Sequence, residues 1–153
     1  MARALLAVGA LLAVALLGLG LAVYLTREED RIAVDNLLSE RITRAIATAE
    51  ARGEDVDLGR VADFDWDEVL LVERDASRAQ VSRALGYEWK GDLAFRTGDL
   101  LIFLRGRQVA RFADYRGEGR FEGVRRPIDR WARDAAVLRV RGLVIRPRGS
   151  PRG

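Results

Sequence analysis

Residues 100–113 read LLIFLRGRQVARFA, and they contain the clearest structural element of the chain. The uninterrupted apolar run Leu100–Leu104 predicts a strand that is buried on both faces. Gly106, between two arginines, supplies the backbone conformation that a tight turn requires. Val109–Ala113 then runs back beside the first strand. The stretch therefore predicts a β-hairpin at the centre of the fold.

Strand character recurs on both sides of this hairpin. Val69–Val72 is another short apolar run and predicts a second strand buried on both faces. Ala135–Val140 and Leu143–Arg146 flank the pair Arg141-Gly142. This arrangement predicts a second hairpin with glycine in its turn.

Two segments have helical signals. Ser77 and Gln80 are spaced as a capping box, in which each side chain satisfies a free backbone donor of the other residue. A short helix is expected to follow, ending at about Leu85 with Gly86 as its stop. Pro127, at a position that favours the first turn of a helix, predicts a short helical turn through Trp131.

These elements predict the class α+β: a small antiparallel sheet of four to five strands with one short helix. Gly53–Phe64 and Asp114–Arg126 show no apolar period, and both are expected to be loops. We expect the domain to span residues 54–147, followed by a basic and disordered tail at 148–153. No internal repeat is evident.

The N-terminal part differs sharply from this body. Residues 4–25 carry no charge and are long enough to cross a bilayer as a helix. Residues 1–26 are therefore expected to be a transmembrane anchor; a cleaved signal peptide is the alternative, because Arg3 precedes the apolar run. Residues 27–53 are expected to form an amphipathic helix, whose apolar members lie three or four positions apart. These members are Val34, Leu38, Ile42, Ala45, Ile46 and Ala49.

Composition narrows the possible chemistry. The 153 residues include no cysteine and no histidine, so the sequence offers no thiolate nucleophile and none of the usual general bases for neutral pH. Asp63, Asp65 and Asp67 have the opening spacing of a calcium loop. Glu68 and Arg74 then stand where such a loop requires glycine and glutamate. We therefore expect no enzyme activity, no metal and no cofactor.

One stretch shows a family resemblance. Trp66-Asp67 with the following strand, Ser77 with Leu85-Gly86 and Trp89, and the run from Leu100 form a WD-strand, helix, LGxxW, hairpin layout. Over residues 64–113 this layout resembles small uncharacterised exported bacterial envelope proteins, many of them lipoproteins. The resemblance implies an extracytoplasmic location. This chain departs from the lipoprotein pattern because no cysteine follows its apolar segment.

The formal net charge of +3 conceals a gradient, because residues 27–100 are predominantly acidic and residues 101–153 predominantly basic. Arg105, Arg107 and Arg111 are expected to form a row on one face of the hairpin. If this row is free of carboxylates, it predicts an interaction surface; the alternative is that it pairs with Asp63, Asp65 and Asp67 within the domain. Trp66 and Trp89 are further candidates for this surface, with burial in the core as the alternative.

The sequence thus predicts a single-pass, membrane-anchored envelope protein with a non-enzymatic binding domain outside the cytoplasmic membrane. Its expected partners are the lipid bilayer and an acidic envelope protein, and no nucleic acid is expected. One alternative is a cytoplasm-facing basic module that binds anionic lipid or nucleic acid. Another is a hydrolase that uses carboxylates alone.

Overall fold

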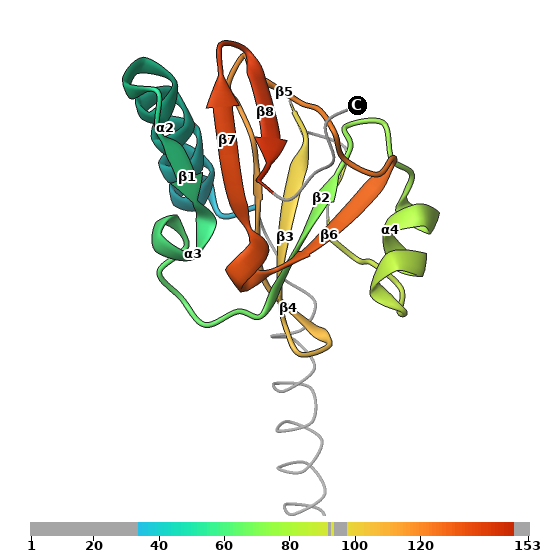
Figure 1. Ribbon diagram of the computed structural model, residues 1–153. Coiled ribbons are helices and arrows are strands. Elements are labelled where there is room, and N and C mark those ends of the chain that lie inside the picture. Colours follow the sequence, from blue (N-terminus) through green and yellow to red (C-terminus); the bar gives the residue numbers. More distant parts are fainter. Residues whose placement is uncertain (1–33, 92, 94–97, 149–153) are drawn as a thin grey trace, which may run out of the picture. The chain divides into compact units, whose positions relative to one another are not determined.

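The hairpin predicted at residues 100–113 is part of a sheet in the computed structural model, which describes residues 34–91, 93 and 98–148 (Figure 1). β3 (Leu100–Arg105) pairs with β4 (Gln108–Asp114), and Gly106 in the turn has a φ of 59°. β3 also pairs with β2 (Glu68–Val72). Both β2 and β3 are buried along almost their whole length, which confirms the prediction for these two strands.

The predicted α+β class is confirmed, but the single sheet of four to five strands is wrong. Among the described residues, the strands form two four-stranded sheets. The first sheet has the order β1-β7-β8-β5 and the second sheet the order β4-β3-β2-β6. All neighbours are antiparallel except β5 and β8. The remaining elements are α2 (Asn36–Arg52), β1 (Asp55–Asp57), α3 (Leu58–Val61), α4 (Arg78–Leu85), β5 (Arg120–Phe121), β6 (Ile128–Ala132), η1 (Arg133–Ala135), β7 (Val137–Arg141) and β8 (Val144–Pro147).

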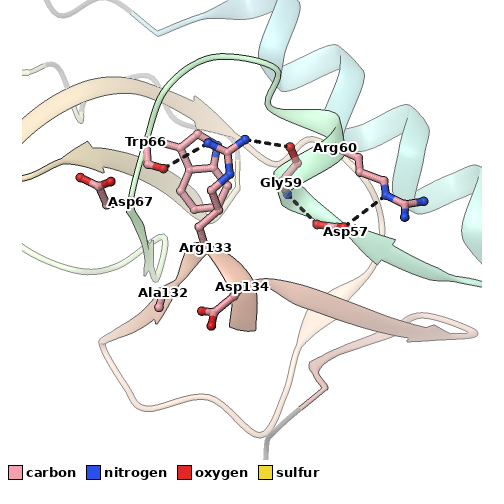
Figure 2. A pocket seen from close by; sticks show the side chains of 8 residues that line it. All are labelled: Asp57, Gly59, Arg60, Trp66, Asp67, Ala132, Arg133 and Asp134. Carbon is pink, nitrogen blue, oxygen red and sulfur yellow. Dashed lines mark hydrogen bonds and ion pairs between the residues drawn. The ribbon is translucent and has the colours of Figure 1, made fainter.

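The segment predicted as a loop between Gly53 and Phe64 contains β1 and α3 instead. Asp57 caps α3 by accepting a hydrogen bond of 2.8 Å from the Gly59 N–H. The Arg133 guanidinium donates to the carbonyls of Gly59 and Trp66 at 3.3 Å (Figure 2) and to that of Phe64 at 3.4 Å. These contacts order a segment whose elements are too short to show a periodic pattern.

The helical turn predicted from Pro127 through Trp131 is also wrong, because this segment is the strand β6. β6 pairs with β2 along five residues. Its polar residue Asp129 accepts hydrogen bonds from the Trp131 indole and from two backbone N–H groups. On one face of β6 Asp129 neighbours Trp131, and on the other Arg130 lies between Ile128 and Ala132. Because each face mixes charged and apolar residues, the sequence lacks the alternating pattern typical of a strand. The predicted loop after Asp114 likewise contains the two-residue strand β5.

Two local predictions are confirmed. α4 begins with the Ser77–Gln80 capping box and ends at Gly86, whose φ is 82°. The second hairpin joins β7 to β8, and Gly142 in its turn has a φ of 54°. Glycine adopts such positive φ values without the steric cost that a side chain would add.

Of the amphipathic helix predicted at 27–53, residues 27–33 lie outside the described residues, and α2 begins at Asn36. Asp35 caps it by accepting a hydrogen bond of 3.0 Å from the Leu38 N–H, and Gly53 ends it with a φ of 67°. Its apolar face is buried, as the spacing predicted; the members are Leu38, Ile42, Ile46 and Ala49. This face belongs to the main core. The Asp35 N–H also bonds to the carbonyl of Phe112, so the start of the helix lies at the outer edge of β4.

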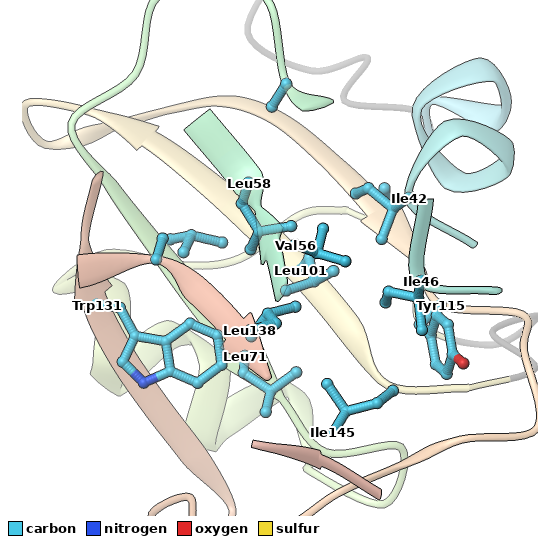
Figure 3. Close-up of a cluster of buried hydrophobic side chains, with 14 of the residues drawn as sticks. Ile42, Ile46, Val56, Leu58, Leu71, Leu101, Tyr115, Trp131, Leu138 and Ile145 are labelled. Atoms are coloured by element: carbon cyan, nitrogen blue, oxygen red, sulfur yellow. The ribbon is translucent and has the colours of Figure 1, made fainter. Parts of the chain in front are cut away.

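The main core lies between the two sheets and α2 (Figure 3). The first sheet contributes side chains such as Leu138 and Ile145, and the second contributes Leu71, Leu101 and others. Because successive side chains of a strand point to opposite faces, Leu70, Ile102 and Leu104 face away from this core. Those residues are also buried, on the side of the second sheet that carries α4.

The prediction of a transmembrane anchor at residues 1–26 is corrected. In the part of the chain that the structure describes, no helix has both the length and the apolar character needed to cross a bilayer. Residues 4–25 themselves, on which the prediction was based, lie outside the described residues, as do residues 149–153 of the predicted tail.

Candidate interaction surface

The hairpin arginines do not form an unpaired row, which was one of the two alternatives for them. Arg105 pairs with Asp65 at 3.1 Å and Arg111 with Asp35 at 3.0 Å. A guanidinium nitrogen of Arg107 instead lies 3.9 Å from where a Cβ on Gly86 would stand, at the end of α4. The row is broken because Arg107 belongs to the turn.

The predicted pairing of the hairpin with the aspartates is also only partial. Asp63 bonds to Arg41 of α2 at 3.0 Å, and Asp67 accepts a hydrogen bond from the Gly106 N–H at 2.6 Å. Only Asp65 therefore pairs with a member of the predicted arginine row. Each of these exposed pairs contributes about 0–1 kcal/mol to stability.

Trp66 and Trp89 are core residues, and each is only 1% exposed. Trp66 packs edge-on against Phe103, and its indole N–H donates to the Ala62 carbonyl at 3.1 Å. Trp89 packs edge-on against Phe112 on the opposite side of the second sheet. Since neither ring presents a face to solvent, the two tryptophans do not form a common binding platform.

The outward face of the first sheet has a different character. Inward positions of its strands, such as Leu138, Val140 and Ile145, are buried in the main core. The alternate positions point outward, and arginine dominates them. We call this surface the arginine face; its arginines are Arg120, Arg139, Arg141, Arg146 and Arg148.

Three of these arginines converge on one carboxylate. Nitrogen atoms of Arg139, Arg141 and Arg148 lie 4.0, 3.9 and 3.8 Å from the carboxylate oxygens of Asp55. These distances exceed hydrogen-bond length, so Asp55 gathers the cations without occupying their donors. The Asp55 side chain is 23% exposed, whereas that of Arg148 is 64% exposed. The guanidinium groups are therefore accessible above a half-buried carboxylate.

A second carboxylate on the same face is shared by two arginines. Glu122 accepts a hydrogen bond of 2.8 Å from Arg146 and lies 4.0 Å from Arg120. Five arginines thus surround Asp55 and Glu122, while Asp57, the other outward acidic position of β1, pairs with Arg60, so the face keeps a surplus of positive charge. In contrast, ion pairs such as Arg41 with Asp63 and Arg130 with Glu68 join one arginine to one carboxylate.

The register of the sheet explains this assembly. Asp55 is the cross-strand neighbour of Arg139, and Arg139 is the neighbour of Arg146. Directly opposite residues on one face of a sheet lie about 4.5–5.5 Å apart at Cβ. β1 thereby brings an acidic residue from the first half of the chain against arginines from its last third.

No family model, curated protein or solved structure matches this chain. The resemblance of residues 64–113 to exported bacterial envelope proteins therefore stays a prediction.

A groove with a volume of about 560 Å³ lies beside α3 and η1 (Figure 2). Arg133 crosses it with its guanidinium 5.1 Å from the centre of the Trp66 ring. Arg60 pairs with Asp57 at 3.4 Å. Both cations of the groove are thus engaged within the fold. Within the described residues, no cluster of three or more acidic, histidine or cysteine side chains is arranged to hold a metal ion.

Sequence reasoning missed the arginine face, although one signal for it was present. The charge gradient located the excess of arginine in the last third of the chain. The alternation of Arg139 with Arg141, and of Arg146 with Arg148, placed each pair on one face of its strand. The role of Asp55 could not be inferred, because the pairing of β1 with β7 joins distant segments.

Proposed function

We propose that this chain provides a non-enzymatic binding domain whose arginine face recognises an acidic segment of a partner protein. The convergence of Arg139, Arg141 and Arg148 on Asp55 carries the proposal. Exposed ion pairs of this length contribute little to stability, and clustered guanidinium groups repel one another. A binding surface gives a reason for such a cluster, since an acidic partner is attracted to the excess charge.

The shape and composition of the face favour an acidic polypeptide over nucleic acid. Four strands about 4.8 Å apart make a plate about 14 Å wide before side chains are added, whereas the major groove is about 12 Å wide. Single-stranded nucleic acid typically stacks its bases on aromatic rings. The outward positions of β7 and β8 instead carry valine and arginine, namely Val137, Arg139, Arg141, Val144 and Arg146.

The test uses fluorescence anisotropy of labelled poly-L-glutamate with the full chain. Replacing Arg139, Arg146 and Arg148 by glutamine should weaken binding about tenfold or more at low salt. Each exposed charge contributes up to about 1 kcal/mol, and 1.4 kcal/mol is a factor of ten. Binding to the unmodified chain should also weaken as salt rises.

The matched control replaces Arg105, Arg107 and Arg111, which changes the net charge equally at the hairpin. We expect this control variant to bind nearly as well as the unmodified chain. If it loses binding while the variant of the arginine face keeps it, the proposal is wrong and the hairpin is the interaction surface. Tighter binding of a DNA duplex than of polyglutamate would instead assign the face to nucleic acid.

A further inference from the structure

Val144 of β8 lies between two arginines on the outward face of the first sheet. Its cross-strand neighbour in β7 is Arg141, and its neighbour in β5 is Arg120. Neighbouring strands are about 4.8 Å apart. Two further arginines come from the adjoining row, because Arg146 follows on the same face of β8 and Arg139 lies opposite Arg146. Val144 is therefore an apolar position with four arginines around it.

The arginines on either side of Val144 are accessible. Their side chains are 79% exposed for Arg120 and 58% exposed for Arg141, whereas Val144 is half-buried. Arg120 lies 4.0 Å from the carboxylate of Glu122, and Arg141 lies 3.9 Å from that of Asp55. Both distances exceed hydrogen-bond length, so neither carboxylate is hydrogen-bonded to these two guanidinium groups.

The carboxylates of the arginine face belong to the adjoining row and not to the row of Val144. Asp55 is the cross-strand neighbour of Arg139. Glu122 accepts its hydrogen bond of 2.8 Å from Arg146. Because β1 begins at Asp55, it does not extend far enough to place a carboxylate opposite the β7 residue of the Val144 row. An acidic side chain above this row would therefore meet an arginine on each side of Val144.

Glu118 is a further carboxylate near this end of the sheet. It belongs to the turn before β5, in which the Gly119 N–H donates at 3.2 Å to the hydroxyl of Tyr115. The Tyr115 side chain lies in the main core, on the other face of the sheet. With Glu118 counted beside Asp55 and Glu122, the five arginines of the face still outnumber the carboxylates.

Val137 is also an outward valine of the first sheet, but its neighbours differ. Asp57 of β1 lies opposite it on one side. On the other side the Arg148 N–H donates to the Val137 carbonyl at 2.8 Å. An acidic side chain above Val137 would therefore meet a carboxylate on one side, which makes Val137 a matched control for Val144.

We propose that the acidic segment of the partner carries an apolar residue that packs on Val144, between carboxylates that bind Arg120 and Arg141. Protein interfaces commonly have an apolar contact at their centre, surrounded by polar groups that exclude water. The Val144 row has this arrangement. The inference rests on the proposed function and adds to it a contact residue and a sequence pattern for the partner, in which an apolar residue is flanked by acidic ones.

The first test compares two peptides of equal charge, EEELEEE and EEESEEE, each with blocked termini. Titrated against the full chain, the leucine peptide should bind about fivefold tighter, which is the effect of removing about one methylene group from water. Equal binding of both, lost in the variant of the arginine face, would disprove the apolar contact and leave the proposed function intact. If neither peptide nor polyglutamate binds, both proposals are wrong.

The second test changes the apolar contact without changing any charge. Val144→Thr is the test variant and Val137→Thr is its control. Threonine is β-branched like valine and favours strands, so both variants should melt within a few degrees of the unmodified chain. The preference for the leucine peptide should fall below about twofold in Val144→Thr, because the hydroxyl must lose water when leucine covers it. The preference should persist in Val137→Thr. A preference that persists in Val144→Thr, or that is lost in both variants, contradicts the contact.

Nuclear Overhauser effects between the peptide and the unmodified chain give a readout that does not depend on how the variants fold. The leucine methyl groups of bound EEELEEE should give stronger effects to the methyl groups of Val144 than to those of Val137. Stronger effects to Val137, or none to either valine under saturating peptide, overturn the inference.

Discussion

Ser39 in α2 donates a hydrogen bond of 2.8 Å from its hydroxyl to the carboxylate of Asp114 in β4, although the two residues are 75 positions apart. The backbone N–H of Asp114 donates in return to the Ser39 hydroxyl at 3.1 Å. Both side chains are buried. Arg116 adds a bond of 3.0 Å from its Nε to each carboxylate oxygen. This network fastens the first turns of α2 to the edge of the second sheet.

Replacing Ser39 by alanine should lower the free energy of unfolding by about 1–3 kcal/mol. The substitution removes the hydrogen bonds that the Ser39 hydroxyl makes with the Asp114 N–H and carboxylate, and loss of buried hydrogen bonds costs about that much. Urea denaturation of the full chain measures the change. Thr48→Ala is the control on an exposed position of the same helix, where about 0.5 kcal/mol or less is expected. Equal effects of the two substitutions would contradict a stabilising role for the Ser39 contact.

Acid should weaken the same network. Burial alone would raise the pKa of Asp114, but hydrogen bonds from Arg116 and Ser39 and the charge of Arg116 lower it below the ordinary value of 3.8. A carboxyl with a lowered pKa contributes stability above its unfolded-state pKa and loses that contribution as pH falls through the folded-state pKa. We therefore expect this contribution to be complete above about pH 5 and to decline below about pH 4.

The comparison with Asp114→Asn isolates this contribution. At pH 7 the variant should be less stable than the unmodified chain, and the difference should shrink as the pH falls below 4. Urea denaturation at a series of pH values measures both. A difference that stays constant from pH 7 to pH 3 would mean that the Asp114 charge does not contribute.

The elements that the sequence predicted correctly are those with a local chemical signature. Ser77 and Gln80 cap α4 through contacts three residues apart, and Gly106 makes its turn through its own backbone. β1 and β5 escaped prediction because they contain only three and two residues. Their pairing is decided by burial of Val56 and Phe121 in a core that the rest of the chain supplies. The residue pattern within each short segment therefore could not predict that the strands form two sheets.

The sequence predicted a basic interaction surface on the hairpin, whereas the surface we propose lies on the first sheet. Arg105 pairs with Asp65, one of the aspartates that the sequence offered as partners, whereas Arg111 pairs with Asp35, which the sequence placed inside a helix. Arg139 and Arg141 share one carboxylate because β1 lies beside β7. Strand order decides whether a carboxylate pairs with one arginine or with several. The charge pattern of the sequence alone does not specify this order.

Arg133 should be a sensitive position for stability even under a conservative change. Its guanidinium donates to three carbonyls, one in α3 and two in the segment between α3 and β2, and it lies over the Trp66 ring. Lysine keeps the charge but cannot reproduce this planar set of donors. Arg133→Lys should therefore cost about 1–3 kcal/mol in urea denaturation. The control is Arg60→Lys in the same groove, where the arginine side chain is 89% exposed and little change is expected.

The last prediction concerns Asp55, whose replacement should strengthen binding to polyglutamate, whereas loss of an arginine should weaken it. Asp55→Asn removes the carboxylate that three arginines share and leaves Arg139, Arg141 and Arg148 with their full charge. Affinity for polyglutamate should rise about two- to fivefold at low salt, since one exposed charge contributes up to about 1 kcal/mol. The gain should vanish near 1 M salt, where the screening length is about 3 Å. Stability should fall by about 1 kcal/mol or less, because the pairs are exposed.

Anisotropy titrations across salt concentrations measure the affinity of Asp55→Asn for polyglutamate. Unchanged or weaker binding of this variant would show that the charge surplus on the arginine face does not attract the acidic chain.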